Sequence, residues 1–325
     1  MMHRRAALLA APALLAAAPL AAQPRWQAAS GFAEGNFHTR NLRQFLTEVR
    51  DATGGAIDAQ LHANGSLLPQ PQIKRGVQQG QVQVGEILLT AYANEDPIFD
   101  LDQVPGIVTS MADARRLMAV RGPVIAERLR RQGIELLYLA PWPFVGIASQ
   151  APLATPEAFR GLRLRTYSAI SNRFAALVGA NGVLLPAPEV AQAFATGIVQ
   201  AQLTTAPVAA DTAAWDTTRV FTLLNVATSN NAVMANARAM AALPAAQQQA
   251  VRAAAARAAE RGWALAEEAH EAAVSRMRER GMQVLAPTPE LLAGLREPSR
   301  QLTEDWLARA GEDGQRLLAA FRAQG

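Results

Sequence analysis

The chain has 325 residues, about twice the size of a typical domain, so two domains are expected. Half of the residues are hydrophobic and 18% are charged, which excludes a disordered polyelectrolyte. Cysteine is absent, and a net charge of +4 results from 31 basic residues scattered among 27 acidic ones. Disulfides and thiolate metal sites are therefore excluded, and nothing in the charge pattern supports nucleic-acid binding.

Residues 1–22 have the pattern of an export signal. Arg4 and Arg5 precede an apolar stretch at 6–18, and small residues favour cleavage after Ala22. The stretch is shorter than the roughly 20 apolar residues that a membrane span needs. An Ala-rich N-terminal helix is the alternative. We expect a soluble mature chain that is exported to the periplasm.

Helical and strand patterns alternate through the next part of the chain, which favours an α/β fold. A Gly122-Pro123 pair predicts that one of the helices is broken into two pieces. The expected elements are helices at 39–53, 73–79 and 111–132, and strands at 56–61, 82–89 and 136–139.

The second half continues the alternation. Thr155-Pro156-Glu157 predicts a helix start, because a capping hydroxyl precedes a proline and an acid. A long helix, about 243–280, would span roughly 50 Å, enough to brace two lobes. The other expected elements are strands at 162–165 and 182–185 and helices at 171–178 and 188–195.

One block of residues in the second half forms a familiar pattern: Thr155-Pro156-Glu157, Gly161-Leu162-Arg163-Leu164-Arg165, Pro186, Glu189-Val190, Ala193 and Gly197. Together they resemble a known family, the DctP-like solute-binding proteins of tripartite ATP-independent periplasmic (TRAP) transporters. The resemblance implies a two-lobed α/β receptor that closes around a small carboxylate and passes it to membrane permease subunits. It places lobe 1 mainly at 23–140, lobe 2 mainly at 141–235 with hinge-strand crossings, and the bracing and C-terminal helices at 236–325.

In the family, the last arginine of the Gly-Leu-basic-Leu-Arg strand binds the ligand carboxylate, and here that residue is Arg165. A planar guanidinium can donate two parallel hydrogen bonds to a carboxylate, which the point charge of a lysine cannot do. The end of a strand is also where ligands sit in α/β folds. A surface salt bridge is the alternative role for Arg165.

The sequence departs from the family at other ligand positions. The position of an arginine that some members carry is Phe144 or Val145 here, and a common asparagine is replaced by Thr204. With Trp142 and Tyr167, these changes predict an aromatic, apolar wall. We therefore expect a monocarboxylate with an apolar or aromatic body, although Trp142 could equally be a packed loop residue.

Three further residues are candidates for ligand contact. Glu86 interrupts an apolar strand, so it either reaches solvent at the strand end or binds a ligand hydroxyl or amine. Asn36 precedes the first long helix and either caps it or faces the cleft. Asn230 and Asn231 point in opposite directions on a strand, so at most one of them, here taken as Asn230, faces ligand.

No linear motif of an enzyme is present. The sequence has no Gly-x-Ser-x-Gly elbow and no phosphate-binding loop. Glu34 and His38 are four residues apart, but no third ligand for a zinc ion is near them in the sequence. We expect no catalytic residues, no metal and no cofactor. Two alternatives to the transport receptor are the ligand-binding receptor of a sensory system and, as a weaker candidate, an exported hydrolase.

Overall fold

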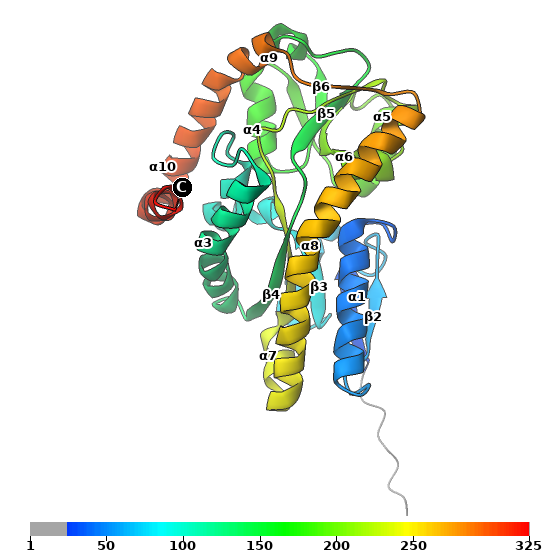
Figure 1. Ribbon diagram of the computed structural model, residues 1–325, viewed down its shortest axis with the longest axis vertical. Coiled ribbons are helices and arrows are strands. Elements are labelled where there is room, and N and C mark those ends of the chain that lie inside the picture. Colours follow the sequence, from blue (N-terminus) through cyan, green and yellow to red (C-terminus); the bar gives the residue numbers. More distant parts are fainter. Residues whose placement is uncertain (1–24, 325) are drawn as a thin grey trace, which may run out of the picture.

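The computed structural model describes residues 25–324. The expected export signal, at 1–22, lies outside the described residues. Two sheets divide the rest of the chain into two lobes, one above the other in Figure 1. Among the described residues, no helix is both long enough and apolar enough to cross a membrane.

Lobe 1 is built on a five-stranded sheet in the order β2-β1-β3-β10-β4. Strand β10 arrives from far along the chain and pairs antiparallel with both of its neighbours. The strands are β1 (Trp26–Ser30), β2 (Ala59–His62), β3 (Val84–Leu88), β4 (Ile134–Pro141) and β10 (Asn230–Asn236). The helices of this part are α1 (Phe37–Ala52), α2 (Ile73–Gln79), α3 (Met111–Arg130) and α7 (Ala237–Ala241).

Lobe 2 is built on a six-stranded sheet in the order β11-β9-β5-β8-β6-β7. Its strands are β5 (Val145–Ser149), β6 (Arg163–Thr166), β7 (Asn181–Leu184), β8 (Ala201–Thr205), β9 (Val220–Thr222) and β11 (Gln283–Leu285). Its helices are α4 (Ala169–Leu177), α5 (Val190–Ala195), α6 (Ala206–Asp211) and α9 (Pro289–Gly294). The chain passes between the lobes from β4 to β5 and again from β9 to β10.

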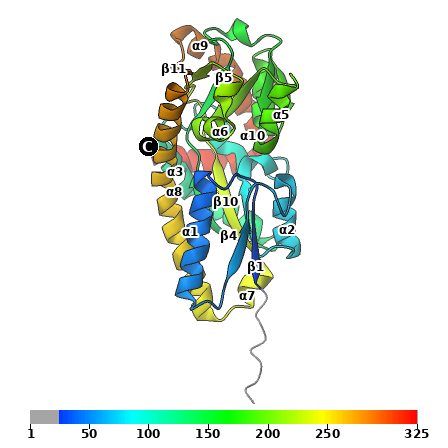
Figure 2. The same ribbon diagram turned by 90° about the vertical axis from the view of Figure 1, so that its right-hand side faces the viewer.

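Two long helices connect the lobes. Helix α8 (Ala245–Glu279) packs on α1 and β4 of lobe 1 and on α6 and β11 of lobe 2 (Figures 1 and 2). Its 35 residues correspond to about 52 Å at 1.5 Å per residue, so the expected long brace is confirmed. Helix α10 (Arg296–Arg322) packs on α3 and α4 and bends at Gly311, whose φ is 56°.

One local prediction was wrong and another was only partly right. Helix α3 runs without a break through Pro123, because a proline removes only one donor and the buried stripe of Leu117, Ile125 and Leu129 holds the helix in place. A helix does begin after Thr155, as expected, but it is the short 3₁₀ helix Pro156–Phe159, and the Thr155 side chain makes no capping hydrogen bond.

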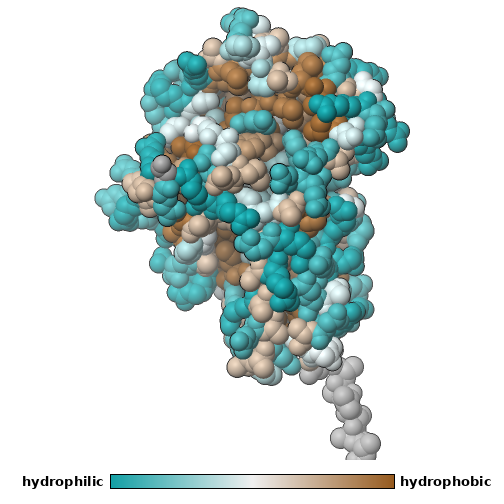
Figure 3. All heavy atoms as spheres, viewed as in Figure 1, coloured by the Kyte–Doolittle hydropathy of each residue, from teal (hydrophilic) through white to brown (hydrophobic). Residues whose placement is uncertain are grey.

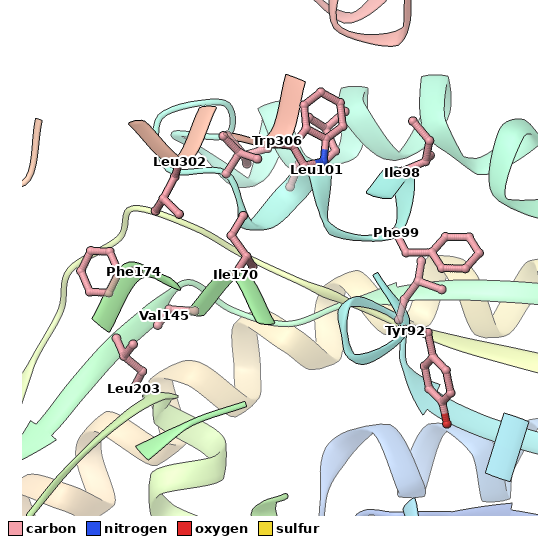
Figure 4. Close-up of a cluster of buried hydrophobic side chains, with 14 of the residues drawn as sticks. Tyr92, Ile98, Phe99, Leu101, Val145, Ile170, Phe174, Leu203, Leu302 and Trp306 are labelled. Atoms are coloured by element: carbon pink, nitrogen blue, oxygen red, sulfur yellow. The ribbon is translucent and has the colours of Figure 1, made fainter. Parts of the chain in front are cut away.

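The largest hydrophobic core continues through the contact between the lobes. Leu302 and Trp306 of α10 pack in the same cluster as Phe99 near lobe 1 and Ile170 of lobe 2 (Figure 4). The indole Nε1 of Trp306 donates to the Pro97 carbonyl at 2.7 Å. The surface of the face shown in Figure 3 is mostly hydrophilic, with a hydrophobic area in its upper part.

Candidate ligand-binding site

A cavity of about 570 Å³ lies between the lobes. Its size falls within the range of about 300–1,000 Å³ that is usual for small-molecule sites. Its lining residues are Phe32, Gln70, Pro71, Leu88, Thr90, Ala91, Tyr92, Asn94, Glu95, Trp142, Arg165, Tyr167, Ser168, Ala169, Leu184, Leu185, Pro186, Ala187, Thr204, Thr205, Val208 and Ser229. Both lobes therefore contribute to one cavity, as a ligand held between them requires.

Arg165 lies on β6, and its side chain is only 3% exposed. Its Nε donates to the Leu185 carbonyl and its Nη1 to the Leu203 carbonyl, each at 3.0 Å. A guanidinium has five N–H groups, so three remain after these two bonds. The two carbonyls fix the orientation of the side chain and leave donors for a ligand.

The charge of Arg165 has no acidic partner among residues 25–324. Other arginines of this part of the chain form ion pairs with aspartates or glutamates, but Arg165 forms none. Burial lowers the pKa of Arg165 to about 10, which leaves the group charged at neutral pH. The Tyr167 ring lies beneath the guanidinium, with 5.6 Å between Cζ and the ring centroid. A buried charge without a counter-ion is costly, so an anion in the cavity would stabilise this arrangement.

Trp142 forms part of an aromatic wall. Its ring packs on His38, with centroids 4.3 Å apart, and on Phe32, with centroids 5.1 Å apart. The indole Nε1 donates to Asn231 Oδ1 at 2.7 Å, so the polar edge of the ring is satisfied within the protein. The ring therefore offers a fixed apolar surface to the cavity.

Two other expected residues also border the cavity. The hydroxyl of Tyr167 donates to Gln103 Oε1 at 2.6 Å, and burial raises the pKa of this tyrosine. Thr204 is 2% exposed, and its hydroxyl has a long contact of 3.4 Å with the Thr205 carbonyl. The same cavity is thus lined by Arg165, Trp142, Tyr167 and Thr204, and their contact with a ligand stays a prediction.

Four expected residues do not line the cavity. Phe144 is half-buried and packs on the large hydrophobic core. Asn36 caps α1 by accepting from the His38 N–H, and its Nδ2 donates to Asp211 Oδ2 of lobe 2 at 2.7 Å. Asn230 donates to Asp102 Oδ2 at 2.5 Å. In each case a partner inside the protein, invisible in the local sequence, determines where the side chain lies.

Glu86 is the fourth of these residues. It is 1% exposed and accepts from the Ser30 hydroxyl at 2.6 Å, so it lies behind the cavity wall. Burial raises the pKa of Glu86 to about 7, against the opposing effect of hydrogen bonds from Ser30 and Asn231. The nearby His38 is fully buried, which lowers its pKa well below the usual value.

Several lining residues carried no usable signal in the sequence. Thr90, Asn94 and Gln70 belong to short segments of lobe 1 with no repeating pattern. Leu184 and Leu185 lie where β7 ends, and only the pairing of β7 with β6 places them beside Arg165. A strand-end position was the one sequence feature that could have indicated these two leucines.

Comparison with known proteins decides the family. Residues 29–309 match the bacterial extracellular solute-binding protein family 7, DctP. The chain belongs to this family. The expected family and the two-lobed fold are thereby confirmed, and the family consists of binding proteins rather than enzymes.

Solved structures of two Bordetella pertussis extracytoplasmic solute receptors that bind pyroglutamic acid, DctP7 and DctP6, are similar to this chain. They are 39% and 37% identical, each with a TM-score of 0.90, covering 92% of this chain and 99% of theirs. A TRAP solute-binding protein from a marine metagenome, specific for pyroglutamate, is 28% identical with a TM-score of 0.89, covering 92% of this chain and 98% of its own.

A curated relative, a solute-binding protein of Albidiferax ferrireducens, is 28% identical over 173 residues. The match covers 53% of this chain and 51% of that protein, so the chain spans about half the length of the curated relatives it matches. These comparisons agree with a solute receptor and favour neither the sensory receptor nor the hydrolase.

Proposed function

We propose that this protein is the periplasmic receptor of a TRAP-type transporter and that it captures pyroglutamate or a closely similar small monocarboxylate. It then delivers the acid to the membrane permease. The observation that carries the proposal is Arg165, a buried cation with free donors and no acidic partner in the described chain, on the wall of a cavity between two lobes.

The ligand chemistry follows from the charges at the cavity. Among the described residues that line the cavity, Arg165 is the one basic residue, so it matches one carboxylate. Phe32, Trp142 and Leu88 supply apolar surface for the body of the ligand. The receptors at 37% and 39% identity bind pyroglutamic acid, a five-membered ring with one carboxylate, and this supports the same class of ligand here.

Delivery requires that ligand change the balance between open and closed lobes. A ligand that contacts both lobes binds the closed form more tightly and so shifts the population toward it. The lining of the cavity by both lobes supports this step. In our proposal the protein does no chemistry on the acid, and the permease recognises the closed form.

The test is isothermal titration and thermal shift on the purified protein with pyroglutamate, succinate, glucuronate and 2-pyrrolidinone, which is the same lactam ring without a carboxylate. Pyroglutamate at about 100 times its dissociation constant should stabilise by about 2.7 kcal/mol. Arg165→Lys should abolish the response, because lysine cannot form the paired bonds. Arg163→Lys is the matched control, since that side chain is exposed and bonds the Gly197 carbonyl.

Binding of 2-pyrrolidinone as tightly as pyroglutamate would contradict the carboxylate anchor. Full binding by Arg165→Lys would do the same. Uptake of labelled pyroglutamate by cells that lose this gene tests delivery: unchanged uptake favours a sensory receptor. Consumption of the acid during titration would support the hydrolase alternative.

A further inference from the structure

Two buried threonines border the cavity from opposite lobes. Thr90 follows β3 of lobe 1 and is 1% exposed, and Thr205 ends β8 of lobe 2 and is 7% exposed. Within residues 25–324, neither hydroxyl has a hydrogen-bond partner. A buried hydroxyl is normally paired, so both side chains lack something that the protein itself does not supply.

Local structure explains why Thr205 lacks a partner. It stands at the N-cap position of α6, where a threonine usually accepts from an N–H in the first turn. Here its side chain makes no such bond. Pro207, at the second position of the helix, has no N–H, so one of the two usual donors to a capping hydroxyl is missing. The hydroxyl is therefore left over at the cavity wall.

Thr90 is left over in a similar way. It lies in a 3₁₀ helix, Leu89–Tyr92, in which its carbonyl accepts from the Ala93 N–H while its hydroxyl bonds nothing. Since Thr90 borders the cavity, the contents of the cavity are its available source of a partner. The same holds for Thr205 on the other lobe.

We propose that Thr90 and Thr205 bind an uncharged polar group of the ligand while Arg165 holds its carboxylate. This inference rests on the proposed function and deepens it. A hydroxyl both donates and accepts, so it suits the N–H and C=O of a lactam or a neutral hydroxyl group. The substrate class is then a small acid with one carboxylate and one neutral hydrogen-bonding group.

The charges around the cavity select against a second carboxylate. Within the part of the chain that the structure describes, the other charged residue of the lining is Glu95, and its carboxylate is paired with Lys74. A dicarboxylate would place its second charge without a counter-ion, near an acid or near apolar surface. Such a charge is costly, so dicarboxylates are expected to bind poorly.

The test compares two probes, pyroglutamate and cyclopentanecarboxylate, which has the same ring size and carboxylate but no amide. The quantity measured is the ratio of their two affinities by isothermal titration. Thr90→Val keeps the side-chain shape and removes the hydroxyl. It should reduce the preference for pyroglutamate over cyclopentanecarboxylate about tenfold. Thr205→Val should do the same, and Thr90→Ser should restore the ratio. Sites that hydrogen-bond a polar group discriminate in this way against analogues that lack it.

Thr196→Val is the matched control, because its exposed hydroxyl bonds the Gln192 carbonyl on α5. Its ratio should equal that of the wild type. An unchanged ratio in both Thr90→Val and Thr205→Val would overturn the inference and leave the receptor function standing. If neither probe binds the wild-type protein, while circular dichroism shows it folded, the proposed function fails and the inference fails with it.

Discussion

Glu86 makes the stability of the protein depend on pH in a way that can be measured. Burial raises its pKa from an ordinary value of 4.5 to about 7. At 1.36 kcal/mol for each pKa unit, this difference corresponds to about 3 kcal/mol. The folded protein holds the proton more tightly than the unfolded chain does, so the contribution is fully present below pH 4.5 and is lost as the pH rises to about 7.

The perturbation is Glu86→Gln, which cannot ionise and can still accept from the Ser30 hydroxyl. We expect the wild type to lose about 3 kcal/mol relative to this variant between pH 4.5 and pH 8. For about 300 ordered residues, an unfolding entropy of about 2.1 cal/mol/K per residue converts this into roughly 5 °C of melting temperature.

The assay is thermal unfolding by circular dichroism of both proteins, without ligand, at pH steps from 4.5 to 8. Taking the difference between the two proteins cancels groups that titrate in both, among them Asp100, whose pKa burial raises to about 6. Burial also lowers the pKa of His38, whose Nδ1 lies 3.9 Å from Glu86 Oε1, well below its ordinary value. A difference in melting temperature that stays constant across the range would refute the reasoning.

Two other substitutions test packing and capping. Asn36→Ala should destabilise the protein by about 1 kcal/mol, the usual cost of losing a helix cap, and Asn36→Ser should cost less because serine still caps α1. Equal urea midpoints for the wild type and both variants would contradict this. Gly262→Val should lower the free energy of unfolding by about 1–3 kcal/mol, because a Cβ at Gly262 would lie only 3.0 Å from Ala140 Cβ on β4. An unchanged urea midpoint would contradict this and show that α8 can move away from β4.

Much of the fold could be predicted because its signals are local. The helix expected at 73–79 has those bounds, since Gly80 ends it with a φ of 79°. The strand carrying Arg165 and the length of α8 likewise follow from nearby residues. The break expected at Pro123 did not occur, because packing against the rest of lobe 1 outweighs one lost donor.

The candidate site was harder to predict, because a side chain faces a cavity only through contacts with distant parts of the chain. Asn36 illustrates this: its partner Asp211 lies 175 residues away. Thr90 is the opposite case, because its hydroxyl has no hydrogen-bond partner among the described residues. Such an absence can be recognised only once the positions of all surrounding residues are known. Arg165 was predicted from a family pattern rather than from its own surroundings, and its contact with a ligand stays a prediction.

The position of β10 constrains the order in which the chain can fold. This strand lies between β3 and β4, yet it is made about 90 residues after β4 ends, as 230 lies 89 positions after 141. During synthesis, the lobe 1 sheet therefore lacks the strand that joins β4 to β3 until residue 236 has emerged, and both β3 and β4 present unpaired edges. A fragment ending at residue 141 should not fold alone, and a chain of such high contact order should fold slowly. Such a delay leaves the chain unfolded for longer after synthesis, which fits the periplasmic location proposed for this protein.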